Sequence, residues 1–149
     1  MKSSPFNSSR QTVTTRERLQ DALRSLETAL RLHHDKAGED RELELALQDS
    51  VVQRFEYTYE LAWNAMRRWI AENDHPQAAE PVYSRKELFR RAARLGLIPD
   101  PIPWMEFHAA RNVSAHPYEK SNARRAFQAA RELVKEGRVL LERLEAGDG

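Results

Sequence analysis

The segment Arg111–Tyr118 holds the side chains with the clearest capacity for chemistry. It reads Arg-Asn-Val-Ser-Ala-His-Pro-Tyr, so a guanidinium precedes an imidazole by five residues, with the amide of Asn112 and the phenol of Tyr118 beside them. Arginine binds phosphate through paired charged hydrogen bonds, and histidine titrates near neutral pH. The segment therefore predicts a phosphate-binding constellation.

The expected backbone brings these groups together. Trp104, Phe107 and Arg111 are spaced by three and four, which places Arg111 on the same helical face as two large aromatics. His116 precedes Pro117, and a residue before proline disfavours helical backbone. A helix that ends between Arg111 and His116 can fold the imidazole back toward the guanidinium, which a continuous helix would not do.

Helical periodicity accounts for the rest of the chain. Leu, Ala, Arg and Glu dominate the composition and glycine is scarce. Ser84 and Glu87 form a capping box that opens a helix ending before Gly96, and a short helix follows Pro103. The other expected helices cover about residues 15–34, 40–73 and 121–144. We expect an all-α fold, an antiparallel up-and-down bundle of four to five helices in residues 15–146, preceded by a flexible tail over residues 1–14.

The expected helix over 40–73 has an unusually wide apolar face. Its apolar residues, among them Phe55, Met66 and Trp69, spread over an arc of roughly 200° on a helical wheel. One neighbouring helix would not cover that arc. The helix is therefore central to the bundle or faces another subunit, which predicts a homodimer.

Composition excludes several classes of function. The 24 Lys and Arg residues nearly balance 23 Asp and Glu residues, so any contact with nucleic acid must be local. The absence of cysteine excludes disulfides and thiolate chemistry, and the histidines show no metal-ligand spacing, so we expect neither metal nor cofactor. No apolar run is long enough for a membrane helix or a signal peptide, which favours the cytoplasm.

Two segments resemble a known family. The pattern Arg111-Asn112-x-x-x-His116-x-Tyr118 is similar to the motif of the HEPN superfamily. The run Arg-Phe-Glu-Tyr-Thr-Tyr-Glu-Leu-Ala-Trp, which ends at Trp63, resembles the branch called nucleotidyltransferase substrate-binding proteins. The helix pattern extends this resemblance over about residues 19–144. The chain departs from the family pattern in having Pro117 between the histidine and the tyrosine.

The resemblance implies a function for each motif residue. Such proteins are helical dimers in which the motif arginines and histidines of two subunits meet at one cleft, and their partner is a minimal nucleotidyltransferase. In the similar HepT-type toxins the HEPN subunit is a metal-independent ribonuclease, which the partner silences by attaching AMP to the motif tyrosine. By this match the catalytic residues would be Arg111, Asn112 and His116, and the modified residue would be Tyr118.

Three hypotheses follow from the sequence. In an endoribonuclease, His116 would take the 2′-hydroxyl proton, Arg111 would stabilise the charged phosphorane, and Asn112 would orient the phosphate or the histidine. In a non-catalytic subunit of a nucleotidyltransferase complex, the same groups would bind a nucleotide or substrate without cleaving it. In a scaffold, the motif would be incidental.

Ordinary structural roles compete with these functions. Arg111 could simply cover an apolar stripe with its side chain, and His116 could be a helix C-cap. Glu60 lies on a polar helical face that is usually solvated, although it could line a cleft. His108 lies one turn before Asn112. We regard His108 and Glu60 as candidates for supporting the site.

Overall fold

The computed structural model describes residues 3–73, 84–113 and 120–147, which form five α-helices and no strand. The helices are α1 (Ser3–Lys36), α2 (Arg41–Asn73), α3 (Arg85–Arg94), α4 (Ile102–Val113) and α5 (Lys120–Gly147). The expected all-α fold is confirmed. The first helix begins at Ser3 rather than near Thr15, and the flexibility expected for residues 1–14 stays a prediction. No described helix is long and apolar enough to cross a membrane.

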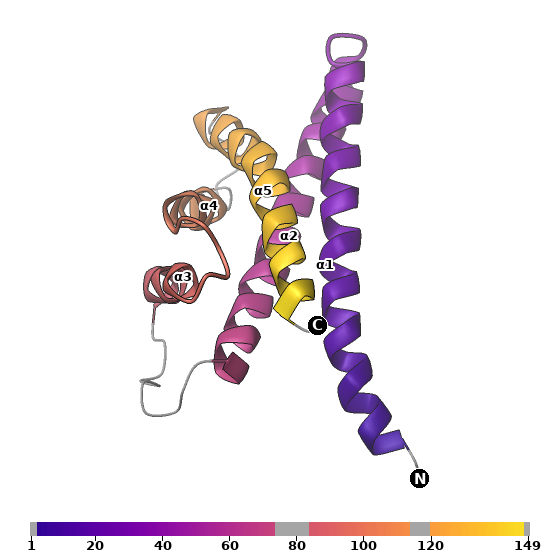
Figure 1. Cartoon of the computed structure of the whole chain (residues 1–149). Helices are drawn as coiled ribbons and strands as arrows, with labels where there is room; N and C mark the ends of the chain where they lie inside the picture. Colours follow the sequence, from indigo (N-terminus) through magenta and orange to yellow (C-terminus); the bar gives the residue numbers. More distant parts are fainter. Residues whose placement is uncertain (1–2, 74–83, 114–119, 148–149) are drawn as a thin grey trace.

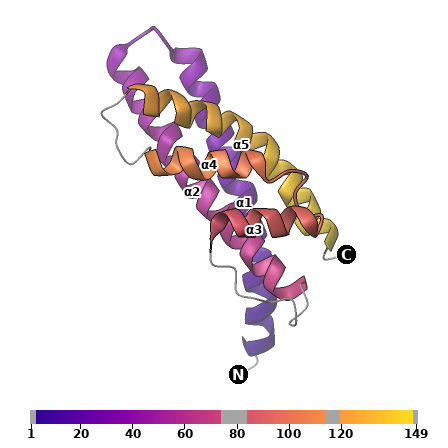
Figure 2. The same ribbon diagram turned by 90° about the vertical axis from the view of Figure 1, so that its left-hand side faces the viewer.

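The three long helices form one side of the molecule and the two short helices the other (Figure 1). α1 and α2 make an antiparallel hairpin, and α5 packs against both of them. α3 and α4 lie side by side and cross the long helices, as Figure 2 shows. The arrangement is therefore a bundle of three long helices with a crossed pair of short helices, rather than five aligned helices.

Local signals in the sequence place the helix boundaries. Gly38 adopts φ +89° in the turn between α1 and α2, a backbone conformation that favours glycine. The carboxylate of Asp40 accepts a hydrogen bond from the backbone N–H of Glu42 at the start of α2. The Ser84 hydroxyl accepts one from the N–H of Glu87, as the capping box predicts. Gly96, at φ +84°, follows the last turn of α3.

All five helices contribute residues to one core. From α1 it takes a leucine stripe at helical spacing, in which Leu19, Leu23 and Leu26 are buried. From the wide apolar face of α2 it takes Phe55 and Tyr59, and the largest buried aromatics of the short helices join them. These are Phe89 of α3 and Trp104 and Phe107 of α4, with Trp104 edge-on to Phe107. Much of the wide apolar face of α2 is thus buried against other helices of the same chain.

α1 and α5 approach each other closely. Gly137 of α5 faces Leu23 of α1, and a Cβ at position 137 would lie 2.6 Å from a Leu23 methyl carbon. The glycine therefore permits a helix separation that a larger residue would not. Arg138 donates a hydrogen bond to the carboxylate of Glu27 at the same contact. This contact holds α5 against α1 and completes the packing of the three long helices.

Candidate functional site

The buried face of α4 places Arg111 and Asn112 in its last turn. Trp104, Phe107 and Ala110 are buried in the core, which fixes the rotation of the helix about its axis. Arg111 follows on the edge of that face, with 38% of its side chain exposed. The spacing in the sequence predicted this position. His116 and Tyr118 lie outside the described residues, so their convergence with Arg111 stays a prediction.

Glu60 of α2 binds two arginines from different helices. Its carboxylate accepts hydrogen bonds from both terminal nitrogens of Arg85, at 3.1 and 3.3 Å. Its Oε2 also lies 3.3 Å from the Nε of Arg111. We call these three residues the Glu60 cluster. The cluster has two positive charges and one negative charge, so it retains a net positive charge beside the end of α4.

Aromatic rings of α2 hold Arg85 in place. Its guanidinium carbon lies 4.1 Å from the centre of the Trp63 ring and 5.4 Å from the centre of the Tyr59 ring. Stacking on an aromatic face and paired hydrogen bonds to a carboxylate both favour a fixed guanidinium plane. Partial burial opposes the charge of Arg85, but the hydrogen bond to Glu60 and the contacts with Tyr59 outweigh it and raise the pKa of Arg85. The cluster is therefore a preformed arrangement of charges.

His108 connects the cluster to Asn112. Its Nδ1 lies 3.1 Å from the hydroxyl oxygen of Tyr59, and its Nε2 lies 3.4 Å from Nδ2 of Asn112. Partial burial, and then the nearby charge of Arg85, lower the pKa of His108. Burial raises the pKa of Tyr59. Both groups are therefore neutral near pH 7, and His108 is suited to orienting Asn112 by hydrogen bonding.

A second ion pair joins the two helices on either side of residues 114–119. Arg125 of α5 donates two hydrogen bonds to the carboxylate of Glu106 on α4, at 2.7 and 2.8 Å. These bonds lower the pKa of Glu106. This ion pair connects the middle of α4 to the second turn of α5.

Arg85, Tyr59 and Trp63 are members of the site that the sequence interpretation missed. Tyr59 and Trp63 belong to the run that carries the family resemblance, but the sequence interpretation assigned neither of them a role at the site. Arg85 directly follows the Ser84 cap, so its place on the first turn of α3 could be read from the capping box. Nothing local indicated that this turn would face Glu60. Glu60 is not simply solvated, since two guanidiniums contact its carboxylate.

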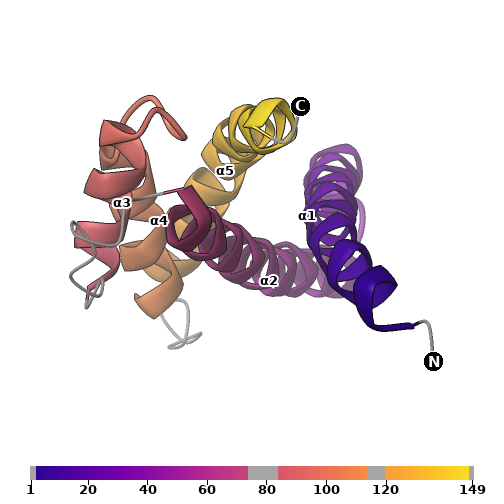
Figure 3. The same ribbon diagram turned by 60° about the horizontal axis from the view of Figure 1, so that its bottom comes forward.

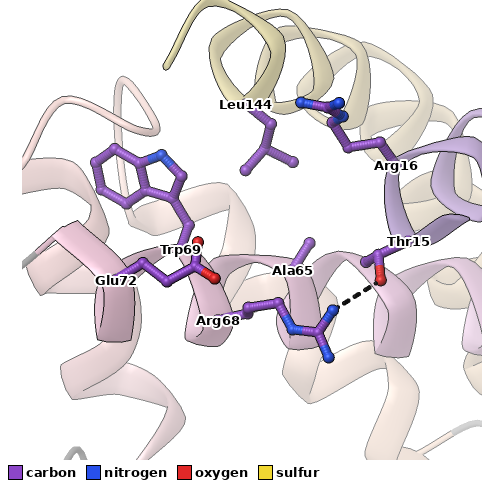
Figure 4. Close-up of a pocket in the computed structure, with 7 residues that line it drawn as sticks. All are labelled: Thr15, Arg16, Ala65, Arg68, Trp69, Glu72 and Leu144. Atoms are coloured by element: carbon purple, nitrogen blue, oxygen red, sulfur yellow. Dashed lines mark hydrogen bonds between the residues drawn. The ribbon is translucent and has the colours of Figure 1, made fainter. Parts of the chain in front are cut away.

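The described residues contain no group of histidines and carboxylates that could hold a metal ion. A small hollow of about 30 Å³ lies among α1, α2 and α5, lined in part by Trp69, Glu72 and Leu144 (Figure 4). None of its lining residues belongs to the Glu60 cluster or to α4. The chemistry available at the Glu60 cluster is therefore anion binding through fixed guanidiniums.

Comparison with known proteins assigns this helical bundle to one family. The sequence pattern of the family described as nucleotidyltransferase substrate binding protein like matches residues 15–146, and the chain belongs to that family. A curated relative, the "Probable ribonuclease HepT" of Haemophilus influenzae, is 30% identical over 93 residues. That match spans 62% of this chain and 64% of the relative, so slightly under two thirds of the relative is covered.

Solved structures share the fold. HI0074 from Haemophilus influenzae, described as the fold of a substrate binding domain of a nucleotidyltransferase, matches with a TM-score of 0.80 at 26% identity. The match covers 87% of this chain and 98% of that one. A protein from Thermus thermophilus matches with a TM-score of 0.60 at 28% identity, over 80% of this chain and 98% of that one. The predicted family and fold are confirmed.

Proposed function

We propose that this protein is a metal-independent endoribonuclease of the HEPN type, acting in the cytoplasm as the toxin of a toxin–antitoxin pair with a minimal nucleotidyltransferase. The observation that carries the proposal is the position of Arg111, whose Nε lies 3.3 Å from the Glu60 carboxylate and which precedes His116 by five residues in the sequence. The similarity to a probable ribonuclease HepT supports the same activity.

The reaction requires three groups. His116 takes the proton from the 2′-hydroxyl, the resulting oxygen attacks the phosphorus, and Arg111 stabilises the charge that develops on the phosphorane. Asn112, oriented by His108, binds a phosphate oxygen. The bond from phosphorus to the 5′-oxygen then breaks, the leaving oxygen takes a proton from water, and His116 returns its proton to solvent. The products are a 2′,3′-cyclic phosphate and a 5′-hydroxyl. No step needs a metal ion.

RNA cleavage in excess EDTA tests this assignment. His116→Ala and Arg111→Ala should each lower the rate by about 10²-fold or more, the usual contribution of a general base or of an oxyanion donor. His34→Ala is a matched control, because His34 is exposed on α1. Cleavage that persists in His116→Ala would remove the site assignment.

The partner is proposed to modify Tyr118. Coexpression with a neighbouring minimal nucleotidyltransferase should add AMP to the intact protein, and Tyr118→Phe should abolish the added mass.

We also propose that the active form is a homodimer whose two motif segments share a cleft. Sedimentation at micromolar concentration tests this, and a strictly monomeric species would contradict it.

A second function is favoured by the description of HI0074 as a substrate binding domain. In this alternative the protein is a non-catalytic subunit that presents a nucleotide to a nucleotidyltransferase, and the same positive site binds phosphate without cleaving RNA. Calorimetry that detects nucleotide binding, in a protein that does not cleave RNA, would favour it over the ribonuclease.

A further inference from the structure

α1 and α2 form a groove on the side of the hairpin away from α5. Two adjoining hollows, of about 470 and 260 Å³, lie along it and share Arg18, and every lining residue belongs to α1 or α2. Figure 3 shows α1 and α2 side by side with α5 on one side of them only. We call this surface the α1–α2 groove.

The α1–α2 groove is strongly basic in a protein with a formal charge of only +1. Arg18, Arg54, Arg67 and Arg68 line it, and Asp21 is the one carboxylate among its lining residues. Asp21 lies 3.9 Å from an arginine outside the groove, Arg24. The positive charge of this surface is therefore local, as a nucleic-acid contact on this chain would require.

Three of the four groove arginines have neutral hydrogen-bond partners. Arg54 donates to the backbone oxygen of Ser25, and Arg68 donates to the hydroxyl of Thr15 (Figure 4). Arg67 lies 3.4 Å from the side-chain oxygen of Asn64. Within residues 3–73, 84–113 and 120–147, none of the four groove arginines forms an ion pair. Their charge is available to an anionic ligand.

An exposed aromatic ring lies among these charges. Tyr57 lines the same hollow as Arg18 and Arg54, and 56% of the residue is exposed. An aromatic ring beside a basic track is the arrangement on which unpaired bases stack.

The groove adjoins the Glu60 cluster. Arg67 is a groove residue, and its guanidinium carbon lies 5.1 Å from the centre of the Trp63 ring. The same ring stacks with Arg85, which binds Glu60. The two arginines and the ring between them thus connect the groove to the site that holds Arg111.

We propose that the α1–α2 groove binds the phosphodiester backbone of single-stranded RNA and leads the strand to the Glu60 cluster. The proposal rests on the proposed ribonuclease function, which it extends by assigning the surface that holds the substrate beyond the cleaved bond. The groove arginines contact phosphates, and Tyr57 stacks on a base. Recognition of this kind is sensitive to salt and tolerant of sequence.

Binding is measured by fluorescence anisotropy with a labelled single-stranded 2′-O-methyl RNA, which cannot be cleaved because it lacks the 2′-hydroxyl. Arg18→Ala combined with Arg67→Ala removes two phosphate contacts. The slope of log affinity against log salt should become shallower by about 1.4, or about 0.7 for each lost contact on a single strand. Arg31→Ala combined with Arg131→Ala makes the same charge change at exposed positions outside the groove and should leave binding unchanged.

A substitution at Tyr57 tests stacking separately from charge. Tyr57→Ala should weaken binding by roughly fivefold or more, and Tyr57→Phe, which keeps the ring, should bind like the unchanged protein. Both variants keep every arginine of the groove. Equal binding by Tyr57→Ala and Tyr57→Phe would contradict the stacking role.

The outcomes separate this proposal from the proposed function. If the unchanged protein cleaves RNA and the groove variant binds as tightly as the control, the groove assignment is wrong and the ribonuclease stands. If the protein binds 2′-O-methyl RNA through the groove but never cleaves RNA, the ribonuclease is wrong. Groove variants that keep RNA binding but lose the homodimer or the nucleotidyltransferase would assign the groove to a protein partner and overturn the proposal.

Discussion

The Glu60 cluster and the α1–α2 groove use arginine in opposite ways. In the cluster, Arg85 and Arg111 share the Glu60 carboxylate, and the Trp63 ring also stacks on Arg85, so Arg85 in particular is oriented before any ligand arrives. In the groove, three of the four arginines have neutral partners, and most of the four are exposed. The comparison teaches that a carboxylate partner offsets the positive charge of an arginine while fixing the direction of its guanidinium.

That difference matches two different tasks. Stabilising a transition state requires groups that are already in position, because reorganisation during the reaction would cost rate. Holding a long anionic strand requires unneutralised charge, and precise direction matters less. The predictions below test whether the two regions divide the work in this way.

The largest effect is expected at Glu60. Glu60→Gln keeps the shape of the side chain and removes the charge that holds Arg111, so kcat for RNA cleavage should fall by about 10²-fold with little change in KM. Arg67→Ala in the groove should instead raise KM and leave kcat nearly unchanged. Steady-state kinetics on a labelled RNA give both constants. Equal changes in KM for the two variants would show that the Glu60 cluster and the α1–α2 groove do not have separate roles.

A pair of tyrosines gives the next effect. Tyr59→Phe removes the hydroxyl that contacts His108 in a buried setting, and should lower the free energy of unfolding by about 1 kcal/mol. Tyr57→Phe makes the same change on the exposed groove residue and should alter it by less than about 0.5 kcal/mol. Urea unfolding measures both. A larger loss for the Tyr57 variant would show that the groove, too, is fixed by internal bonds.

Acidification should weaken the fold through His108. Its pKa in the folded protein is lowered from 6.5, first by burial and then by Arg85, so the unfolded chain binds a proton more readily. Stability is therefore full above about pH 6.5 and is lost as the pH falls toward the folded pKa. His108→Asn should make this pH dependence smaller, while His34→Asn should not. The other charged groups that act on His108 are Glu60, Arg111 and Lys86.

Urea unfolding midpoints across this pH range check the prediction. RNA binding by the α1–α2 groove should be nearly independent of pH over the same interval, because no histidine is among its lining residues. A pH dependence of stability that is the same in His108→Asn and in the unchanged protein would assign the titration to another group.

The smallest effect is expected at the ion pair between Glu106 and Arg125. Its closest distance, 2.7 Å, is shorter than the 3.1 Å between Arg85 and Glu60, but its side chains are more exposed, at 48% and 42%. Solvent screening leaves such pairs a contribution of about 0.5 kcal/mol. Arg125→Ala should therefore destabilise the protein less than Arg85→Ala, as urea unfolding would show. The reverse order would mean that distance matters more than burial here.

Most of the secondary structure could be predicted from the sequence. The leucine stripe of α1, the capping box at Ser84 and the glycine at position 96 are local signals, and local signals place helix boundaries. The position of Arg111 beside Trp104 and Phe107 also followed from helical spacing. These features depend on residues close together in the chain.

The crossing of α3 and α4 over the long helices could not be predicted in the same way. It depends on how Phe89 of α3 and Trp104 of α4 pack against each other in the core, which periodicity does not describe. The pairing of Arg85 with Glu60 joins residues 25 positions apart and follows from that crossing. The sequence therefore indicated the end of α4 as a site, while the side chains that orient it became visible only in three dimensions.

The contact between Gly137 and Leu23 has a consequence for synthesis of the protein. During synthesis on the ribosome, α1 emerges long before α5. Leu23 of α1 therefore remains exposed to water until translation has passed Gly137, which packs against it. An unfinished polypeptide that already carries the complete motif still lacks a closed core. Closure of the core, and with it the proposed nuclease activity, therefore requires that α5 has emerged from the ribosome.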